Sequence, residues 1–164
     1  PPNPPERMPT RTAHPFNVAT PTCRVVAASG GHQHGLVVTG DGFVWAAGDG
    51  REGALGNGSD GARTNVLVPV VGLDQVSRVA AGAALSLALS HDGTVWGWGG
   101  NHFGQLGDGT ESSSSVPVRV RDLLNVTAIA AGQPIDRLVW IVILPSSDGG
   151  DQCPEVTGLL GCSG

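Results

Sequence analysis

The sequence has few charged residues, few cysteines and no long apolar run, and each shortage argues against a class of protein. Only 14% of the 164 residues are charged, and the nine Lys and Arg residues are scattered in a chain of formal net charge −5. Nucleic-acid binding needs clustered Lys and Arg, so we expect no direct nucleic-acid contact by this segment. The three cysteines, Cys23, Cys153 and Cys162, make neither a disulfide framework nor a Cys-x-x-Cys zinc motif, which leaves a Cys153–Cys162 bridge as an alternative.

The longest apolar run is short. It covers residues 138–144, whereas a membrane-spanning helix takes about 20 residues, so we expect no membrane contact. No signal peptide opens the printed chain, which favours an intracellular location. Because the chain starts with Pro1, it is expected to be either processed at the N-terminus or a fragment.

Glycine is abundant, with 26 residues, and many of the glycines belong to a motif that occurs twice. Asp-Gly-Phe-Val-Trp at residues 41–45 returns as Asp-Gly-Thr-Val-Trp at residues 92–96, 51 positions later. Ala-Leu-Gly-Asn-Gly at residues 54–58 returns as Gln-Leu-Gly-Asp-Gly at residues 105–109. A fixed period near this length indicates one structural unit that is stacked. The residues expected to build its frame are Asp41, Gly42, Trp45, Gly82, Asp92, Gly93, Trp96, Trp98, Gly104 and Gly107.

Each copy reads as four short strands. In the second copy, an apolar segment at 76–82 is followed by an alternating segment at 85–90, an aromatic segment at 94–99 and a closing segment at 116–120. Alternation with a period of two is typical of strands, and the Asp-Gly between the second and third segments predicts a type I′ hairpin turn. Four antiparallel strands per unit predict all-β propeller blades.

The pattern divides the chain into five parts. These are a Pro-rich disordered arm (1–22), a first propeller repeat (23–75), a second repeat (76–125), the degraded start of a third (126–144) and an irregular tail (145–164). The arm holds seven of the twelve prolines and no periodic apolar pattern. Within the repeats we expect Trp45, Trp96 and Trp98 to be wedged between blades.

These motifs resemble the repeat of the regulator of chromosome condensation family. The resemblance rests on Val-Ala-Ala-Gly, alternating leucines, Asp-Gly-x-Val-Trp-x-Trp-Gly and Gly-Gln-Leu-Gly-x-Gly, which the second copy carries nearly complete from Val76 to Val120. The first copy departs at Ala46-Ala47, where a second Trp is common, and the third loses the pattern after Gly132. The resemblance implies a β-propeller, commonly of seven blades.

Two repeats and a fraction fill only part of such a propeller. Seven periods of 51 residues need about 357 residues, and an open arc leaves strand edges unpaired. We therefore expect this chain to be part of a larger propeller or to self-associate through its open blade edges.

One glycine motif and one histidine pair can each be interpreted either as a chemical site or as part of the repeat. Gly48 to Gly53 has the Gly-x-Gly-x-x-Gly spacing of dinucleotide-binding loops, but the residues that follow do not favour the helix that this chemistry needs, so a repeat turn is predicted. The His32-x-His34 pair has the spacing for a metal on one strand face, but no third ligand is predictable nearby, and His91 and His102 would lie on other blade edges. We favour the structural interpretation of both.

No motif indicates catalysis. Asp41 and Asp92 are explained as the first residues of hairpin turns rather than as a pair for acid–base chemistry. We predict a protein that is not an enzyme and has no cofactor, metal or catalytic residue.

The function that we predict is a non-catalytic protein-interaction module. Recognition concentrates in loops that differ on a constant scaffold, which points to residues after the aromatic strand. The candidate partner-binding residues are Asp49, Arg51 and Glu52 in the first copy and Asn101 and His102 in the second. The family resemblance implies two alternatives, guanine-nucleotide exchange on a small GTPase and an extracellular propeller-type enzyme inhibitor.

Overall fold

The computed structural model describes residues 24–61, 63–123, 125–132 and 141–145. These residues form ten β-strands and one short 3-10 helix, which confirms the predicted all-β class. The strands are β1 (Val25–Gly30), β2 (His34–Thr39), β3 (Val44–Gly48), β4 (Thr64–Pro69), β5 (Val76–Ala81), β6 (Leu85–Ser90), β7 (Val95–Gly99), β8 (Ser114–Arg119), β9 (Val126–Ala131) and β10 (Ile141–Pro145), and the 3-10 helix is η1 (Arg51–Gly53). Within the described residues, no helix has the length and apolar character that crossing a bilayer requires.

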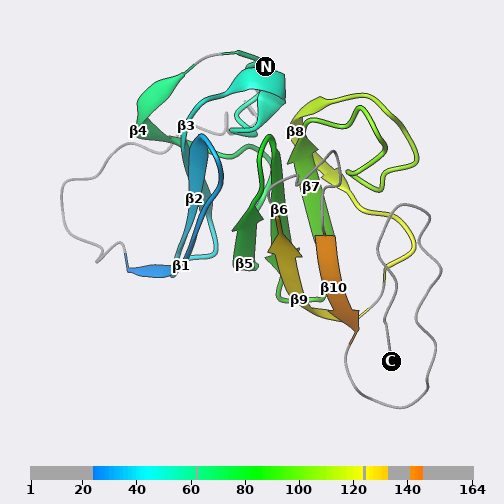
Figure 1. Cartoon of the computed structure of the whole chain (residues 1–164). Coiled ribbons are helices and arrows are strands. Elements are labelled where there is room, and N and C mark those ends of the chain that lie inside the picture. Colours follow the sequence, from blue (N-terminus) through cyan, green and yellow to red (C-terminus); the bar gives the residue numbers. More distant parts are fainter. Residues whose placement is uncertain (1–23, 62, 124, 133–140, 146–164) are drawn as a thin grey trace, which may run out of the picture.

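The strands form three antiparallel sheets that stand side by side (Figure 1). Strands β1 to β4 make a four-stranded sheet in chain order, here called blade 1, and β5 to β8 make blade 2 in the same way. Strand β9 pairs with β10 in a two-stranded sheet, here called the half-blade. A four-stranded meander repeated side by side is the architecture of propeller blades, as the sequence predicted.

The two blades repeat each other down to single backbone hydrogen bonds. Equivalent pairs, with the N–H donor first, are Thr39–Phe43 and Ser90–Thr94 in the hairpins, and Val70–Val44 and Val120–Val95 at the closing strands. The offset between copies is 51 residues in the hairpins and 50 for the donor that follows the closing strand. The first copy therefore has one residue more than the second between its third and fourth strands, where the loops differ.

The hairpin turns differ from the predicted type I′ geometry. The N–H of Gly42 donates to the C=O of Thr39, and Gly42 has a φ of +83°, but Asp41 does not adopt a positive φ. A type I′ turn needs positive φ at both central residues, which costs energy at an Asp. The loop is instead one residue longer and places only its Gly in the left-handed region, and blade 2 repeats this with Gly93 at +82°.

The outer strands β4 and β8 satisfy part of their exposed backbone locally. The hydroxyl of Thr64 donates to the C=O of Val66 at 3.1 Å and accepts the N–H of the same residue at 3.2 Å. Ser114 makes the equivalent pair of contacts with Val116. Each strand also contains a proline, which has no N–H to offer a neighbouring strand. Edges of this kind are poor templates for pairing with another chain.

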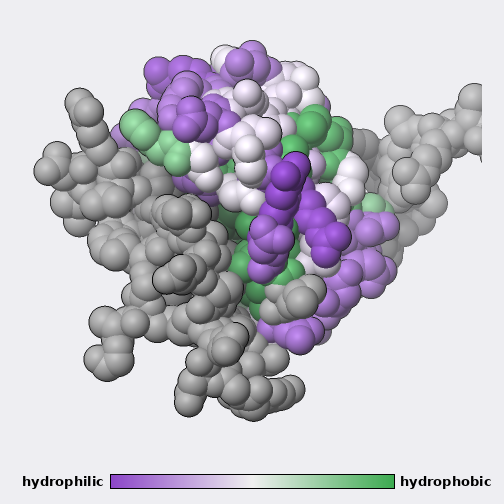
Figure 2. Space-filling view, turned by 90° about the vertical axis from the view of Figure 1, so that its right-hand side faces the viewer, coloured by the Kyte–Doolittle hydropathy of each residue, from purple (hydrophilic) through white to green (hydrophobic). Residues whose placement is uncertain are grey.

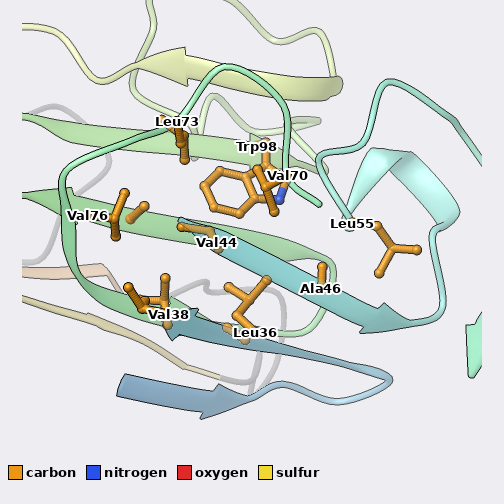
Figure 3. Packing of buried hydrophobic residues seen from close by; sticks show 12 residues of the cluster. Leu36, Val38, Val44, Ala46, Leu55, Val70, Leu73, Val76 and Trp98 are labelled. Carbon is orange, nitrogen blue, oxygen red and sulfur yellow. The ribbon is translucent and has the colours of Figure 1, made fainter. Parts of the chain in front are cut away.

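The main hydrophobic core lies between blade 1 and blade 2 (Figure 3). Trp98 is fully buried there, with Val44, Val70 and Leu73 nearby. The whole cluster comprises Leu36, Val38, Val44, Ala46, Leu55, Val70, Leu73, Val76, Val79, Ala81, Ala88 and Trp98. Burial of a Val or Leu side chain stabilises the fold by about 1.5–3 kcal/mol relative to exposure. Because the cluster contains residues of both blades, the two blades share one hydrophobic core.

The other two tryptophans predicted to lie between blades differ from Trp98 in burial. Trp96 is half-buried and packs against the main core. Trp45 is also half-buried, but it follows Val44, whose side chain enters the core, so the Trp45 side chain leaves on the opposite face of blade 1. In the described residues, Trp45 therefore does not join the core between the blades.

Within the described residues, both faces of blade 2 pack against another sheet, whereas only one face of blade 1 does. All six residues of β6 are buried, while β2 alternates between buried and half-buried residues over its first four positions. The difference arises because β9 of the half-blade packs on the second face of blade 2, where Leu87, Leu106 and Ile129 meet.

Candidate protein-interaction rim

Two glycine-rich loops after the third strands form one rim of the molecule. Rim loop 1 (residues 49–61) follows β3 and contains η1, and rim loop 2 (residues 100–113) connects β7 with β8. Rim loop 1 rests on blade 2, because η1 packs against β7 and β8 and the N–H of Gly58 donates to the C=O of Ser115 at 2.9 Å. The residues predicted to bind a partner therefore come from two blades but share one edge of the fold.

Asp49 and Arg51 are bound to each other. Nε and Nη2 of Arg51 donate to Oδ2 of Asp49 at 2.9 and 2.6 Å, and the Arg51 N–H donates to Oδ1 at 3.0 Å. Nη2 also donates to Oε1 of Gln33 at 2.8 Å. The side-chain hydrogen bonds from Arg51 lower the pKa of Asp49 to about 2. The Arg51 side chain is 70% exposed and that of Asp49 only 11%, so the guanidinium is the group presented to solvent.

Glu52 and His102 meet across the two blades. Nε2 of His102 lies 3.4 Å from Oε2 of Glu52, and the side chains are 64% and 40% exposed, respectively. Glu52 has a φ of +58°, a left-handed conformation that is uncommon for a residue with a side chain. A Cβ atom at Gly100 would collide with the Glu52 carboxylate, so a larger residue at this position would displace that carboxylate.

Asn101 is not available to a partner, contrary to the expectation from the sequence. It is fully buried, and its Oδ1 accepts the N–H of Leu106 at 2.8 Å. Its Nδ2 donates to the C=O of Thr110 at 2.9 Å and to the C=O of Ser112 at 3.1 Å. The physical reason is that a buried amide has to find internal partners, and rim loop 2 supplies them. Asn101 therefore positions the loop that presents His102.

Phe103 is an exposed residue that the sequence pattern did not single out. Its side chain is 69% exposed, beside His102 at the tip of rim loop 2. The signal that could have found it is an aromatic residue inside a Gly-rich loop, at the position that Glu52 holds in the first copy. An exposed aromatic next to charged groups is typical of contact surfaces.

A buried hydrogen-bond network holds rim loop 1 on blade 2. The C=O of Ala54 accepts the Trp98 Nε1–H at 3.0 Å and the Ser86 hydroxyl at 2.8 Å. The Ser86 Oγ also lies 2.8 Å from Nε2 of His34 on blade 1. Gly56 packs so closely on the Trp98 indole that a Cβ there would collide with the ring. The position of rim loop 1 is thus set by side chains that lie 32 and 44 residues further along the chain than Ala54.

The two motifs with a chemical alternative lie at the ends of strands of blade 1. The Gly48–Gly53 segment contains the single turn of η1, and the described residues contain no α-helix whose N-terminus would receive a pyrophosphate. His32 is exposed and His34 is buried against Ser86, so the pair does not face one ligand. No group of three or more His, Cys, Asp or Glu residues that would suit a metal occurs in the described part of the chain.

Two hollows occur among the described residues. A groove of about 860 Å³ lies between rim loop 2 and the end of β8 and is lined by Asp108, Thr110 and residues 118–123. Figure 2 shows this side of the molecule, where hydrophobic side chains are visible between hydrophilic ones. A smaller pocket of about 280 Å³ lies between blade 1 and the hairpin of blade 2, lined in part by Asp74, Asp92 and Trp96. Neither hollow is lined by the residues predicted to bind a partner.

Several named proteins are similar to this chain. It is 39% identical to human E3 ubiquitin-protein ligase HERC2 over 111 residues and 36% identical to human HERC6, a probable E3 ubiquitin-protein ligase, over 119 residues. These alignments cover 65% and 70% of this chain but only 2% and 12% of the relatives. The mouse X-linked retinitis pigmentosa GTPase regulator is 36% identical over 112 residues, which cover 63% of this chain and 11% of that protein.

Solved structures share the fold. Human WBSCR16 matches 68% of this chain with a TM-score of 0.61 and 29% identity, over 29% of its own length. Prp20p from Saccharomyces cerevisiae matches 74% with a TM-score of 0.62 and 20% identity, over 31% of its length. The chain thus corresponds to less than a third of these propellers.

The family assignment rests on a direct match to the repeat. The model of the regulator of chromosome condensation (RCC1) repeat matches residues 41–89 and 92–134, more than half of the chain, and a second model of the same repeat matches residues 76–105. The matched segments contain the Asp-Gly hairpins, both rim loops and the closing strands described above. The chain belongs to the RCC1 repeat family.

Proposed function

We propose that this chain is a non-catalytic protein-interaction module that binds its partner with the rim formed by Arg51, Glu52, His102 and Phe103. The observation that carries the proposal is the contact between Glu52 and His102, which joins exposed side chains of two blades into one surface. The frame beneath this surface is constant between copies, whereas the rim residues differ, as expected where recognition is added to a scaffold.

The chemistry of the rim suits a protein partner. Arg and aromatic residues are enriched among the residues that carry binding energy at protein interfaces, and the rim offers Arg51 and Phe103 with 70% and 69% exposure. Asp49 and Gln33 hold the Arg51 guanidinium, and Asn101 holds the loop that carries Phe103. Pre-organised side chains lose less conformational entropy when a partner binds.

The ligase activity named for HERC2 and HERC6 is not proposed for this chain. The chain spans 2% of the first protein and 12% of the second, and the family repeat is the part that is shared.

The test compares partners captured by three forms of the chain in lysate of its source cells. The wild-type chain, the double variant Arg51→Ala/Phe103→Ala and the control variant His91→Ala, whose exposed residue lies in the opposite hairpin, are each immobilised and the bound proteins are quantified by mass spectrometry. We expect the wild type and the control to retain the same proteins and the double variant to lose them. Retention by the double variant would assign binding to another surface.

Guanine-nucleotide exchange is the second candidate. It is favoured by the 36% identity with a protein named as a GTPase regulator and by the likeness in fold to Prp20p, a protein that binds Gsp1p and histones. Release of fluorescent GDP from Gsp1p, measured with and without this chain, tests the activity. A rate that rises with the concentration of the chain would support exchange, and an unchanged rate despite measurable binding would support the module alone.

A further inference from the structure

Rim loop 1 contains an Asn-Gly pair at its contact with blade 2. Asn57 is the one asparagine in the sequence that a glycine follows. Asparagine loses its side-chain amide most readily in such a pair, because glycine has no side chain to hinder attack by its own backbone nitrogen. Gly58 is exposed, and no described heavy atom lies within 4 Å of the place where its Cβ would be. Neighbouring side chains therefore do not hinder the reaction at Gly58.

The nitrogen that attacks in this reaction is held by the neighbouring blade. The N–H of Gly58 donates to the C=O of Ser115 on β8 at 2.9 Å. Deamidation requires this nitrogen to lose its proton and to bond to Cγ of Asn57. The hydrogen bond opposes both steps, because it stabilises the protonated nitrogen and directs it toward Ser115. The contact between the blades therefore protects the Asn-Gly pair.

The second copy shows how one product of the reaction fits the fold. It has Asp108 where the first copy has Asn57. Oδ1 of Asp108 accepts the N–H of Thr110 at 2.9 Å, and Oδ1 of Asn57 accepts the N–H of Ser59 in the same way at 3.1 Å. An aspartate at position 57 therefore suits this turn. An isoaspartate does not, because its main chain runs through Cβ and is one atom longer just before Gly58.

We propose that Asn57 is a deamidation site that the contact between rim loop 1 and blade 2 protects. When the loop leaves Ser115, a base from solvent removes the Gly58 N–H proton, and the nitrogen bonds to Cγ of Asn57. The Cγ–Nδ2 bond breaks, and ammonia leaves after taking a proton from water, which closes a succinimide ring. Water then adds to one of the two ring carbonyls and yields aspartate or isoaspartate. Either product carries one more negative charge than asparagine.

The experiment compares the folded chain with a free peptide of the same sequence. Trypsin cleaves after Arg51 and Arg63, and the resulting peptide 52–63 contains Asn57 as its one asparagine and no glutamine. The 164-residue chain and synthetic peptide 52–63 are incubated in the same mildly alkaline buffer, and the mass gain at Asn57 is measured by mass spectrometry after subtraction of an unincubated sample. We expect deamidation to be at least about fivefold slower in the chain. Equal rates would overturn the proposal.

A matched pair of variants tests whether the contact with blade 2 gives the protection. A Cβ at Gly53 would collide with Cα and N of Ser115, so Gly53→Ala forces rim loop 1 away from β8. Gly104 holds the equivalent position in rim loop 2 and also has a positive φ, +72° against +80° at Gly53. A Cβ there lies at an ordinary 3.7 Å from the C=O of Thr110, so Gly104→Ala introduces similar backbone strain without displacing rim loop 1.

The two variants should differ in their rate of deamidation at Asn57. We expect Gly53→Ala to approach the rate of the free peptide and Gly104→Ala to keep the rate of the wild type. A slow reaction in folded Gly53→Ala, or a fast one in both variants, would contradict the proposal. If Gly53→Ala does not fold, Trp98→Phe takes its place, because it removes the indole donor to the Ala54 carbonyl of rim loop 1 and keeps a large apolar ring.

Discussion

The two rim loops reach the same backbone path by different means. In both, a glycine N–H donates to a carbonyl three residues earlier, Gly53 to Gly50 and Gly104 to Asn101, each at 3.0 Å. Rim loop 1 then closes when the Gly50 C=O also accepts the N–H of Gly61. Rim loop 2 closes through the buried side-chain amide of Asn101 instead.

The difference shows where each loop obtains its stability. Rim loop 1 has Gly50 at the position that Asn101 holds in rim loop 2, and it depends on a neighbour, because Ser86 and Trp98 of blade 2 donate to its Ala54 carbonyl. Rim loop 2 carries its own internal support in Asn101. Rim loop 1 is therefore held by side chains of the neighbouring blade, and rim loop 2 is held by one of its own side chains. Substitutions in the two sets of contacts should change the stability of the two loops separately.

The largest expected effect comes from removing the external support. Trp98→Ala leaves a cavity in the core between the blades and removes one of the two donors to the Ala54 carbonyl, and we expect it to lower the free energy of unfolding by about 3–5 kcal/mol. Trp45→Ala, at a half-buried position outside that core, should cost clearly less. Urea unfolding of both variants measures the difference. Equal losses would mean that the two tryptophans have the same structural role.

Removing the internal support comes next. Asn101→Gly places the residue of rim loop 1 in rim loop 2, and the loss of its buried hydrogen bonds should lower the free energy of unfolding by about 2–3 kcal/mol. Hydrogen exchange should accelerate in residues 100–113 and remain unchanged in residues 49–61. Acceleration in both loops would show that the supports are not separate.

The contact between the loops should matter less for stability. Gly100→Ala forces the Glu52 carboxylate away from His102, and because both side chains are substantially exposed we expect a change in the free energy of unfolding below about 1 kcal/mol. Partner capture by the rim should nevertheless weaken. Unfolding and capture measured on the same variant separate the two roles, and unaffected capture would remove this contact from the proposed surface.

The smallest effect concerns the charge pair within rim loop 1. In Arg51→Gln, the pKa of Asp49 should rise from about 2 toward its ordinary value of 3.8, because the side-chain donors that lower it are lost. The wild-type pair stabilises the fold above pH 3.8, and that contribution disappears as the pH falls through about 2. NMR titration of the Asp49 carboxyl measures the change. An unmoved pKa would assign the lowering to the backbone.

The fold was predictable because its determinants are local. The Asp-Gly pairs and the alternating leucines each constrain a short segment. Their return after 51 residues predicts that the four-stranded blade is repeated. The turn type was predicted wrongly, because the choice between a two-residue loop and a longer one depends on the φ of Asp41, which composition does not determine.

The site was predictable only in part. Its place after the third strands followed from the repeat, and so did the exposed positions of Arg51 and His102. The burial of Asn101 did not, because it depends on carbonyls 9 and 11 residues further along the chain. The pairing of His34 with Ser86 spans 52 residues and leaves no local pattern.

The external support of rim loop 1 also sets an order of events during protein synthesis. Ala54 precedes Trp98 by 44 residues, which take about 2–9 s to translate at typical rates of 5–20 residues per second. During that interval rim loop 1 has been synthesised, but Trp98, which donates to its Ala54 carbonyl, has not. Until Trp98 has been added, the Ala54 carbonyl lacks its indole donor, so rim loop 1 is held on blade 2 only after most of blade 2 has been synthesised.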